Sequence, residues 1–222
     1  MRRTMVFAAL CAALMPGLAT AQGLGVAAKA GTIGVGLEGA VALGSSFAIR
    51  AGGAFLPVNV DRTYSGLEFG LDLPDSYMNV GVDLYPGGGP FRISGGLLFK
   101  PDEPVITGNF TQTQNIGGRD YSPAEIGTLV GEIDSGDRAP FVSVGIGRIA
   151  SSGFGVFMDL GVALLDDPTL SIRHEGGSLT GAQRAEFEAR LEQERQDIED
   201  DLGSWQRFYP IVQVGVKFGL GN

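Results

Sequence analysis

Residues 34–53 read GVGLEGAVALGSSFAIRAGG and contain two alternating segments joined by the short turn Gly44-Ser45-Ser46. One register of the first segment, extended back by one residue, holds Ile33, Val35, Leu37, Gly39, Val41 and Leu43. The other register holds Gly34, Gly36, Glu38, Ala40 and Ala42. A period of two places these sets on opposite faces of a β-strand. The stretch predicts antiparallel strands with one apolar face and one face of small residues and isolated charges.

The same stretch also spells G-x-G-x-x-G at Gly34, Gly36 and Gly39, and the acidic Asp61 follows about twenty positions later. A dinucleotide-binding turn needs a strand before these glycines and a helix that opens at them. Only four residues separate Gly39 from Gly44, and they continue the alternation. We therefore interpret Gly34 and Gly36 as strand glycines that let neighbouring groups approach closely.

The alternation returns in three later segments of about ten residues. Their apolar registers are Phe91, Ile93, Gly95, Leu97, Phe99; Phe154, Val156, Met158, Leu160, Val162, Leu164; and Phe208, Pro210, Val212, Val214, Val216, Phe218. This length suits a tilted strand that crosses a bilayer, and aromatic residues near the ends fit an interfacial girdle. The second face, mostly Gly, Ala and Ser, fits the lumen of a narrow barrel. A lipocalin-like soluble periplasmic barrel is the alternative.

Short turns at 43–46, 85–90 and 150–153 alternate with long polar connections at 59–66, about 101–135 and 173–205, as in outer-membrane barrels. The expected strands are 24–30, 33–43, 47–58, 67–85, 91–100, 138–149, 154–172 and 207–220. If residues 24–43 formed one strand, an even count would require another strand within 105–116. The prediction is an all-β fold: an antiparallel transmembrane β-barrel of about eight strands, with one helix in the last long loop.

The first twenty-one residues have the features of an export signal. Arg2 and Arg3 precede an apolar run over 5–15, and Ala19-Thr20-Ala21 forms an A-x-A cleavage site. We expect residues 1–21 to be removed and 22–222 to form the barrel. Cleavage would remove the only cysteine, Cys11, and two arginines, which leaves 14 basic residues against 25 acidic ones and a net charge of −11. Such a charge argues against nucleic acid as a partner.

The terminal segment QVGVKFGL places Gln213, Gly215, Phe218 and Leu220 in a polar-x-Gly-x-x-aromatic-x-hydrophobic pattern. With the signal and the strand–turn–strand units, this pattern resembles the small eight-stranded outer-membrane barrels, the class of the OmpA transmembrane domain and OmpW. The resemblance implies a location in the outer membrane of a Gram-negative bacterium, contact with outer-membrane lipid, and recognition by the barrel-assembly machinery. The sequence does not reveal the oligomeric state, and we favour a monomer. The chain departs from many members by continuing Gly219-Leu220-Gly221-Asn222.

The lumen-facing register collects seven charges from different strands. They are Lys29, Glu38, Arg50, Asp83, Arg92, Asp159 and Lys217. Two hypotheses fit them: a polar path with a selectivity field, or an internal ion-pair network that offsets the desolvation of buried charges. Because side chains roughly fill an eight-stranded interior, we favour the network and a largely closed lumen.

Residues 180–203, TGAQRAEFEARLEQERQDIEDDLG, predict a helix capped by Thr180 and ended by Gly203. It forms the core of a loop insertion at 178–203. Its apolar residues recur at helical spacing and are followed by a tryptophan: Phe187, Leu191, Ile198, Leu202 and Trp205. The hypotheses are a lid over the barrel mouth, a solvated helix on the rim, or, if the strand count is off by one, a periplasmic helix.

His174 is the only histidine, so no histidine-based metal site or catalytic triad can be assembled, and its position at a strand end predicts exposure. We interpret the acidic segments 134–137 and 166–168 as turns rather than calcium sites. We expect no enzyme activity, cofactor or metal. The predicted function is an envelope-structural or surface role. The alternatives are a narrow channel for uptake of a small hydrophilic solute and a surface-interaction protein that acts through acidic extracellular loops.

Overall fold

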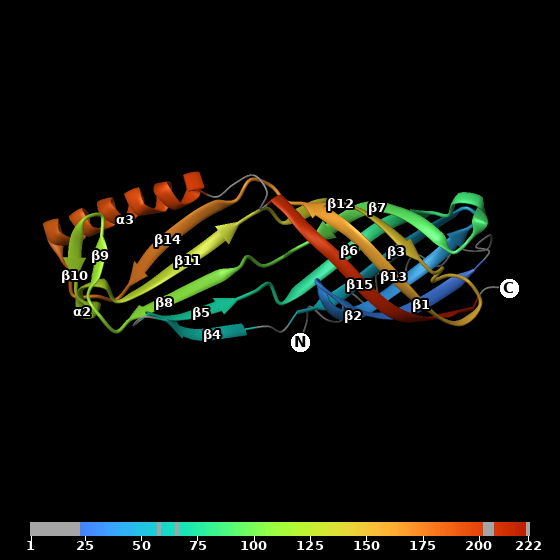
Figure 1. Ribbon diagram of the computed structural model, residues 1–222, viewed down its shortest axis with the longest axis horizontal. Helices are drawn as coiled ribbons and strands as arrows, with labels where there is room; N and C mark the ends of the chain where they lie inside the picture. Colours follow the sequence, from blue (N-terminus) through green and yellow to red (C-terminus); the bar gives the residue numbers. More distant parts are fainter. Residues whose placement is uncertain (1–22, 57–58, 65–66, 202–206, 221–222) are drawn as a thin grey trace.

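The computed structural model describes residues 23–56, 59–64, 67–201 and 207–220, so the predicted signal peptide lies outside the described residues. Eight strands close into an antiparallel barrel in the order β1-β15-β13-β12-β7-β6-β3-β2, as predicted (Figure 1). Their bounds are β1 Leu24–Gly31, β2 Gly34–Leu43, β3 Phe47–Phe55, β6 Ser76–Leu84, β7 Phe91–Phe99, β12 Arg138–Ile146, β13 Gly153–Leu164 and β15 Phe208–Gly219. Residues 24–43 form two strands, so the one-strand alternative is wrong.

Short turns gather at one end of the barrel, which we call the turn end. The turns are 44–46, 85–90, which includes the 3-10 helix η2 Pro86–Gly88, and 147–152. The first and last described strands also meet at this end, where the Leu220 N–H donates to the Leu24 carbonyl at 2.6 Å. The even strand count thus brings the start of β1 and the end of β15 to the same end of the barrel. The long connections lie at the opposite end, which we call the barrel mouth.

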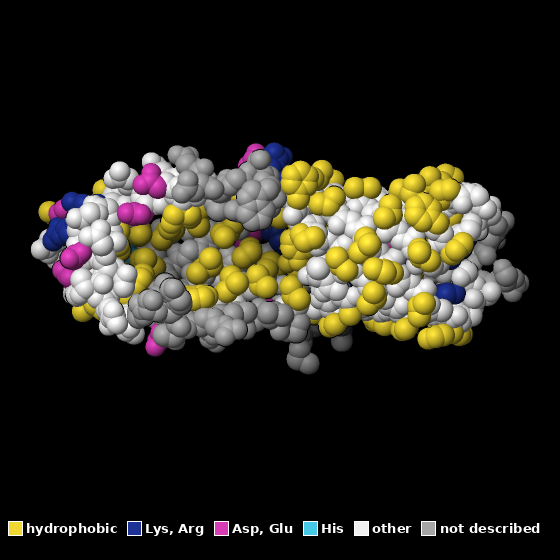
Figure 2. Space-filling model, in the orientation of Figure 1, with side chains coloured by type: hydrophobic (Ala, Val, Ile, Leu, Met, Phe, Trp, Pro, Cys, Tyr) yellow, Lys and Arg dark blue, Asp and Glu magenta, His cyan; other side chains and the backbone are white. Residues whose placement is uncertain are grey.

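The barrel is apolar outside and charged inside. Val35, Ile93 and Val156 are 56%, 40% and 70% exposed, whereas Arg92 and Asp159 are completely buried. In Figure 2, hydrophobic side chains cover the barrel, while charged side chains gather on the other half of the molecule. This arrangement is the opposite of a lipocalin-like soluble barrel and fits a surface in contact with lipid. Ile33 is an exception to the predicted register, because β2 starts at Gly34 and Ile33 is buried in the barrel.

A second, five-stranded sheet with the order β14-β11-β8-β5-β4 extends from the barrel mouth. Its strands are β4 Asn59–Tyr64, β5 Leu67–Asp72, β8 Val105–Phe110, β11 Thr128–Asp134 and β14 Thr169–Glu175. The predicted single strands 67–85 and 154–172 are therefore wrong, since each divides between the barrel and this sheet. Pro74 and Pro168 lie at the two divisions, where a residue without a backbone N–H interrupts the ladder. The expected polar loops at 59–66 and 101–135 contain the other three strands of the sheet, β4, β8 and β11.

The far end of the extension is a small core built on this sheet. The hairpin β9 Gln114–Ile116 and β10 Arg119–Tyr121, the short helix α2 Pro123–Ile126 and the long helix α3 Gly181–Asp201 surround it. Its buried members include Tyr121, Phe187 and Leu191, with Leu129 and Ile172 of the sheet packed against them. We use "the extension" for the five-stranded sheet together with these elements.

Helix α3 confirms the predicted helix, with its first residue at Gly181. It packs on β14 and β9, away from the barrel mouth, so the predicted lid position is wrong (Figure 1). Phe187 and Leu191 are buried, but Ile198 is 45% exposed, and Leu202 and Trp205 lie outside the described residues. No helix within the described part of the chain is long and apolar enough to span a membrane.

Candidate functional site

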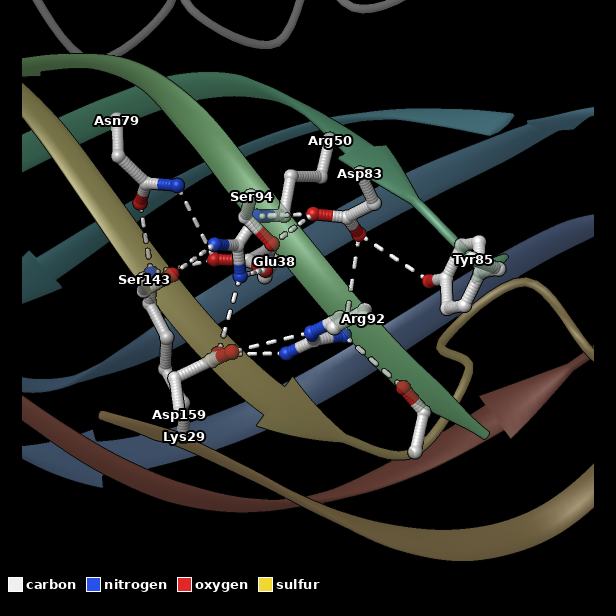
Figure 3. A network of polar contacts seen from close by, with 11 residues as sticks. Lys29, Glu38, Arg50, Asn79, Asp83, Tyr85, Arg92, Ser94, Ser143 and Asp159 are labelled. Carbon is white, nitrogen blue, oxygen red and sulfur yellow. Dashed lines mark hydrogen bonds and ion pairs between the residues drawn. The ribbon is translucent and has the colours of Figure 1, made fainter. Parts of the chain in front are cut away.

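Six of the seven predicted lumen charges meet in one network inside the barrel, which we call the charge cluster. Its members come from six strands: Lys29, Glu38, Arg50, Asp83, Arg92 and Asp159 (Figure 3). Period-two alternation points each of these side chains inward, and the antiparallel register brings them to similar heights.

Glu38 holds one side of the cluster. Its Oε2 accepts a hydrogen bond from Lys29 Nζ at 2.6 Å and another from Asn79 Nδ2 at 3.2 Å. Lys29 Nζ also donates to Asn79 Oδ1 at 2.7 Å. The second carboxylate oxygen, Oε1, accepts from Arg50 Nη1 at 3.1 Å. The lysine and the carboxylate therefore have several partners each, as buried charges require.

Two arginines and two aspartates form the other side. Asp159 accepts from Arg92 Nε at 3.0 Å and Nη2 at 2.5 Å, and from Arg50 Nη1 at 3.1 Å. Arg50 Nε lies 3.1 Å from Asp83 Oδ1, which also accepts from the Ser94 hydroxyl at 2.6 Å. The paired contacts of Arg92 with one carboxylate fix its guanidinium plane.

The charge cluster contains three cations and three anions, so it is formally neutral. An apolar layer lies on each side along the barrel axis. Toward the mouth lie Ile33, Ala54, Tyr77, Leu98, Ala139, Phe141, Ala163 and Ile211. Toward the turn end lie Ala27, Ala40, Ala42, Ile149, Ala150 and Phe157. A hydrated ion or polar solute would have to cross both layers and break the network between them.

Arg148 closes the turn end. Its Nη1 donates to the Ser45 carbonyl at 2.7 Å and to the Gly88 carbonyl at 2.8 Å, which ties three turns together. Its guanidinium also lies 4.2 Å from the ring centroid of Tyr85, which is buried and donates to Asp83 at 3.2 Å. Neither Arg148 nor Tyr85 was among the predicted site residues.

Lys217, the seventh predicted charge, lies apart from the cluster. Its Nζ donates to the carbonyls of Ser151, Ser152 and Gly153 at 2.6, 3.1 and 3.0 Å, and to the Ser151 hydroxyl at 2.8 Å. These contacts stabilise the turn between β12 and β13. Its role in the structure is therefore to anchor a turn rather than to line a path.

The sequence interpretation missed three polar members of the network: Asn79, Ser94 and Ser143. Asn79 shares the inward register of Asp83, and Ser94 shares that of Arg92, so the period-two pattern contained the signal. Ser143 lies 3.4 Å from Arg50 Nη2. Small uncharged polar residues are common on both faces of strands, which is why the pattern alone did not identify them.

The glycine motif lies in the barrel wall. Gly34 has a φ of +99°, at the start of β2, and a Cβ on Gly36 would lie 2.0 Å from the Gly53 carbonyl oxygen. Gly39 differs, because a Cβ added there would lie 4.0 Å from the nearest atom, the Ala51 carbonyl oxygen. Two of the three glycines thus permit the close approach of backbone atoms from β3 and the residues after it, as predicted. The chain continues as a strand after Gly39, whereas a nucleotide site requires a helix there.

The predicted assembly signal divides between the two faces of β15. Gln213 is buried in the lumen, where its Oε1 has no hydrogen-bond partner among the described residues. Phe218 and Leu220 are 53% and 66% exposed on the outer surface. Gly215 lies against Phe157, whose ring atom would be 2.4 Å from an added Cβ. The aromatic and terminal hydrophobic positions are accessible from outside the barrel.

The prediction that His174 is exposed is wrong. Its side chain is 5% exposed, its ring packs edge-on against Phe187 at 5.2 Å, and Nε2 lies 3.2 Å from Glu188 Oε1. His174 is buried because α3 packs on β14, and the sequence pattern around His174 does not reveal this contact. The acidic segment 134–137 forms a turn in which Asp134 Oδ1 accepts from the Gly136 N–H at 2.9 Å. Within the described residues, no group of three His, Cys, Asp or Glu is arranged to hold a metal ion.

No family model matches the chain, and no curated protein sequence matches it significantly. Solved structures do match. Acinetobacter baumannii CarO aligns with a TM-score of 0.56 and 18% identity over 89% of this chain and 97% of its own. Acinetobacter baumannii CarO2 aligns with a TM-score of 0.59 and 19% identity over 90% and 99%. The chain therefore has the fold of a small outer-membrane β-barrel protein.

Proposed function

We propose that this chain is an integral outer-membrane barrel of a Gram-negative bacterium, that its lumen is closed, and that it serves an envelope-structural or surface role. The observation that carries the proposal is the layered interior: a neutral charge cluster between two apolar layers. Lipid would contact the apolar exterior, and the exposed Phe218 and Leu220 would be available to the barrel-assembly machinery. A monomer fits, because the barrel closes without a second chain.

Planar-bilayer recordings test the closed lumen. The purified protein should show no reproducible single-channel steps, because a permeating ion would lose hydration in the apolar layers without gaining a free partner in the cluster. Lys29→Met and Arg50→Met serve as matched variants. Regular wild-type steps whose size changes in these variants would instead support the alternative, a narrow channel for a small hydrophilic solute.

A surface-interaction role is the second candidate, and the charged extension favours it. Helix α3 presents Arg and Glu side chains to solvent, including the Arg184–Glu188 and Arg195–Glu192 pairs at 2.8 Å each. Binding of the protein in liposomes to cell-surface or matrix fractions, with and without residues 178–203, would test this role. Equal binding by both forms would exclude the helix as the interacting element.

A further inference from the structure

A pocket of about 160 Å³ lies at the barrel mouth, where the barrel meets the extension. We call it the mouth pocket. Its walls come from strand ends and from the connections that lead into the extension: Leu56, Leu73, Pro74, Tyr77, Leu98, Lys100, Pro104, Ser135, Gly136, Arg138, Ala139, Leu165 and Tyr209. It lies beyond the mouth-side apolar layer and is therefore separate from the charge cluster.

Most of the pocket wall is apolar. Leu98 and Ala139 are buried, and Leu165 packs against them. The rings of Tyr77 and Tyr209 stack with centroids 6.3 Å apart, and the Tyr209 hydroxyl is occupied, since it donates to the Thr32 carbonyl at 2.8 Å. An engineered apolar cavity of about 150 Å³ binds benzene, so this volume suits one six-membered ring.

Lys100 supplies a polar edge to the pocket wall, and Glu103, beside the wall residue Pro104, is its ion-pair partner. The Lys100 side chain is 7% exposed, and its ammonium donates to Glu103 Oε2. An ammonium carries three N–H donors, but Glu103 Oε2 is the one side-chain acceptor that Lys100 has among the described residues. Glu103 Oε1 is buried and has no donor there. Both members of the pair therefore keep hydrogen-bonding capacity that burial makes costly to leave unused.

The apolar wall and the polar edge together favour one chemical class of ligand for the mouth pocket. A hydroxyl group can accept from the lysine and donate to the carboxylate at once. Glu103 already neutralises the Lys100 ammonium, and Arg138, the other cation of the wall, is exposed to water, so a buried carboxylate ligand would lack an unpaired cation. A pure hydrocarbon would leave the Lys100–Glu103 pair unsatisfied. We propose that the mouth pocket binds a small monocyclic phenol, with its ring between the leucines and the tyrosine pair and its hydroxyl at Lys100, beside the Lys100–Glu103 ion pair. This binding does not depend on whether the lumen conducts.

The test uses the protein purified from membranes and placed in lipid nanodiscs, with 4-fluorophenol and fluorobenzene as ¹⁹F NMR probes and empty nanodiscs as the reference. The wild type should bind 4-fluorophenol with a millimolar or lower Kd, and about tenfold more tightly than fluorobenzene, because a hydrogen bond to a charged group is worth about one factor of ten or more. Lys100→Met keeps the side-chain length and should abolish this preference, whereas Lys217→Met, at the turn end, should retain it.

Ala139→Phe provides an independent check, because it fills the pocket and should abolish binding of both probes. Each variant must first show the heat-dependent gel shift of a folded barrel. If Ala139→Phe fails to fold, the comparison of Lys100→Met with wild type still decides the matter. Wild-type spectra identical to those with empty nanodiscs, or an unchanged preference in Lys100→Met, would overturn the proposal.

Discussion

Asp159 is the residue on which the charge cluster depends most. It contacts both Arg50 and Arg92, and all three side chains are at least 97% buried. Asp159→Ala should lower the free energy of unfolding by about 3–5 kcal/mol, because it leaves two buried guanidinium groups short of a partner. Urea unfolding in detergent would measure the effect. Asp167→Asn is the control, since Asp167 is 80% exposed and pairs with Arg207 on the surface. Equal effects of the two changes would contradict this account.

The glycines of residues 34–39 give a second test on a single strand. Gly36→Ala forces a Cβ to within 2.0 Å of a backbone oxygen, whereas Gly39→Ala has 4.0 Å of room. We expect Gly36→Ala to lower the free energy of unfolding by about 1–3 kcal/mol or to block folding, because backbone must move. Gly39→Ala should be close to neutral. The heat-dependent gel shift and urea midpoint of each variant report the difference, and similar midpoints would refute the wall-packing explanation.

At the scale of elements, Phe187 holds α3 against the rest of the extension, where its ring packs on Tyr121 of β10 and His174 of β14. Its ring is completely buried and packs edge-on against Tyr121, with centroids 4.9 Å apart. Phe187→Ala should weaken the docking of α3 by about 3–5 kcal/mol, as large-to-small core changes do, while the barrel stays folded. Limited proteolysis within 181–201 should accelerate, and the heat-dependent gel shift should persist. Ile198→Ala is the matched control, and acceleration of equal size there would contradict the packing that the structure shows.

The same helix should respond to acid over a defined range. Hydrogen bonds from Arg195 and Gln196 lower the pKa of Glu192 to about 2 from an ordinary value near 4.5. Hydrogen bonds from Arg184 and His174 also lower the pKa of Glu188. A lowered folded-state pKa stabilises the helix fully above the unfolded pKa, and this stability is lost as pH falls through the folded value.

The helical signal in far-UV circular dichroism should therefore stay constant from neutral pH to about 4.5 and decline toward pH 2. Glu192→Gln should show a smaller decline over this interval, because the titrating carboxylate is absent. A decline that is already complete above pH 5, or one unchanged in Glu192→Gln, would show that other groups control the helix.

At the scale of the whole molecule, the barrel and the extension require different surroundings. The barrel exposes large apolar side chains around its circumference, such as Leu37 at 70% and Phe154 at 74%. The extension carries surface ion pairs such as Arg119–Glu186 at 2.7 Å. The barrel should therefore be embedded in lipid while the extension projects into water, with the transition at the mouth pocket.

This division predicts that the protein lacking residues 1–21 stays folded and monodisperse only with detergent or lipid. Apolar surface on this scale drives association in water. Size-exclusion chromatography before and after detergent removal, with boiled and unboiled gel samples, would check it. A monodisperse, folded sample in plain buffer would refute the membrane assignment.

The alternating registers were enough to predict a barrel of about eight strands and to separate an apolar face from a face of small residues and charges. This prediction depends on a period of two, which is local, so Val35 and Glu38 are assigned to opposite faces without knowledge of their neighbours. The structure then shows Val35 on the outside and Glu38 inside. The sequence also located α3, because helix-forming residues between Thr180 and Gly203 are a local signal as well.

The point where the barrel stops became clear only from the three-dimensional fold. Alternation continues past Pro74 and Pro168, because a sheet with one covered face has the same period as a barrel wall, so the pattern could not separate β5 from β6 or β13 from β14. The face of α3, the burial of His174 and the partners of Arg148 were likewise undetermined. Each depends on contacts between segments distant along the chain, which a pattern within one segment does not encode.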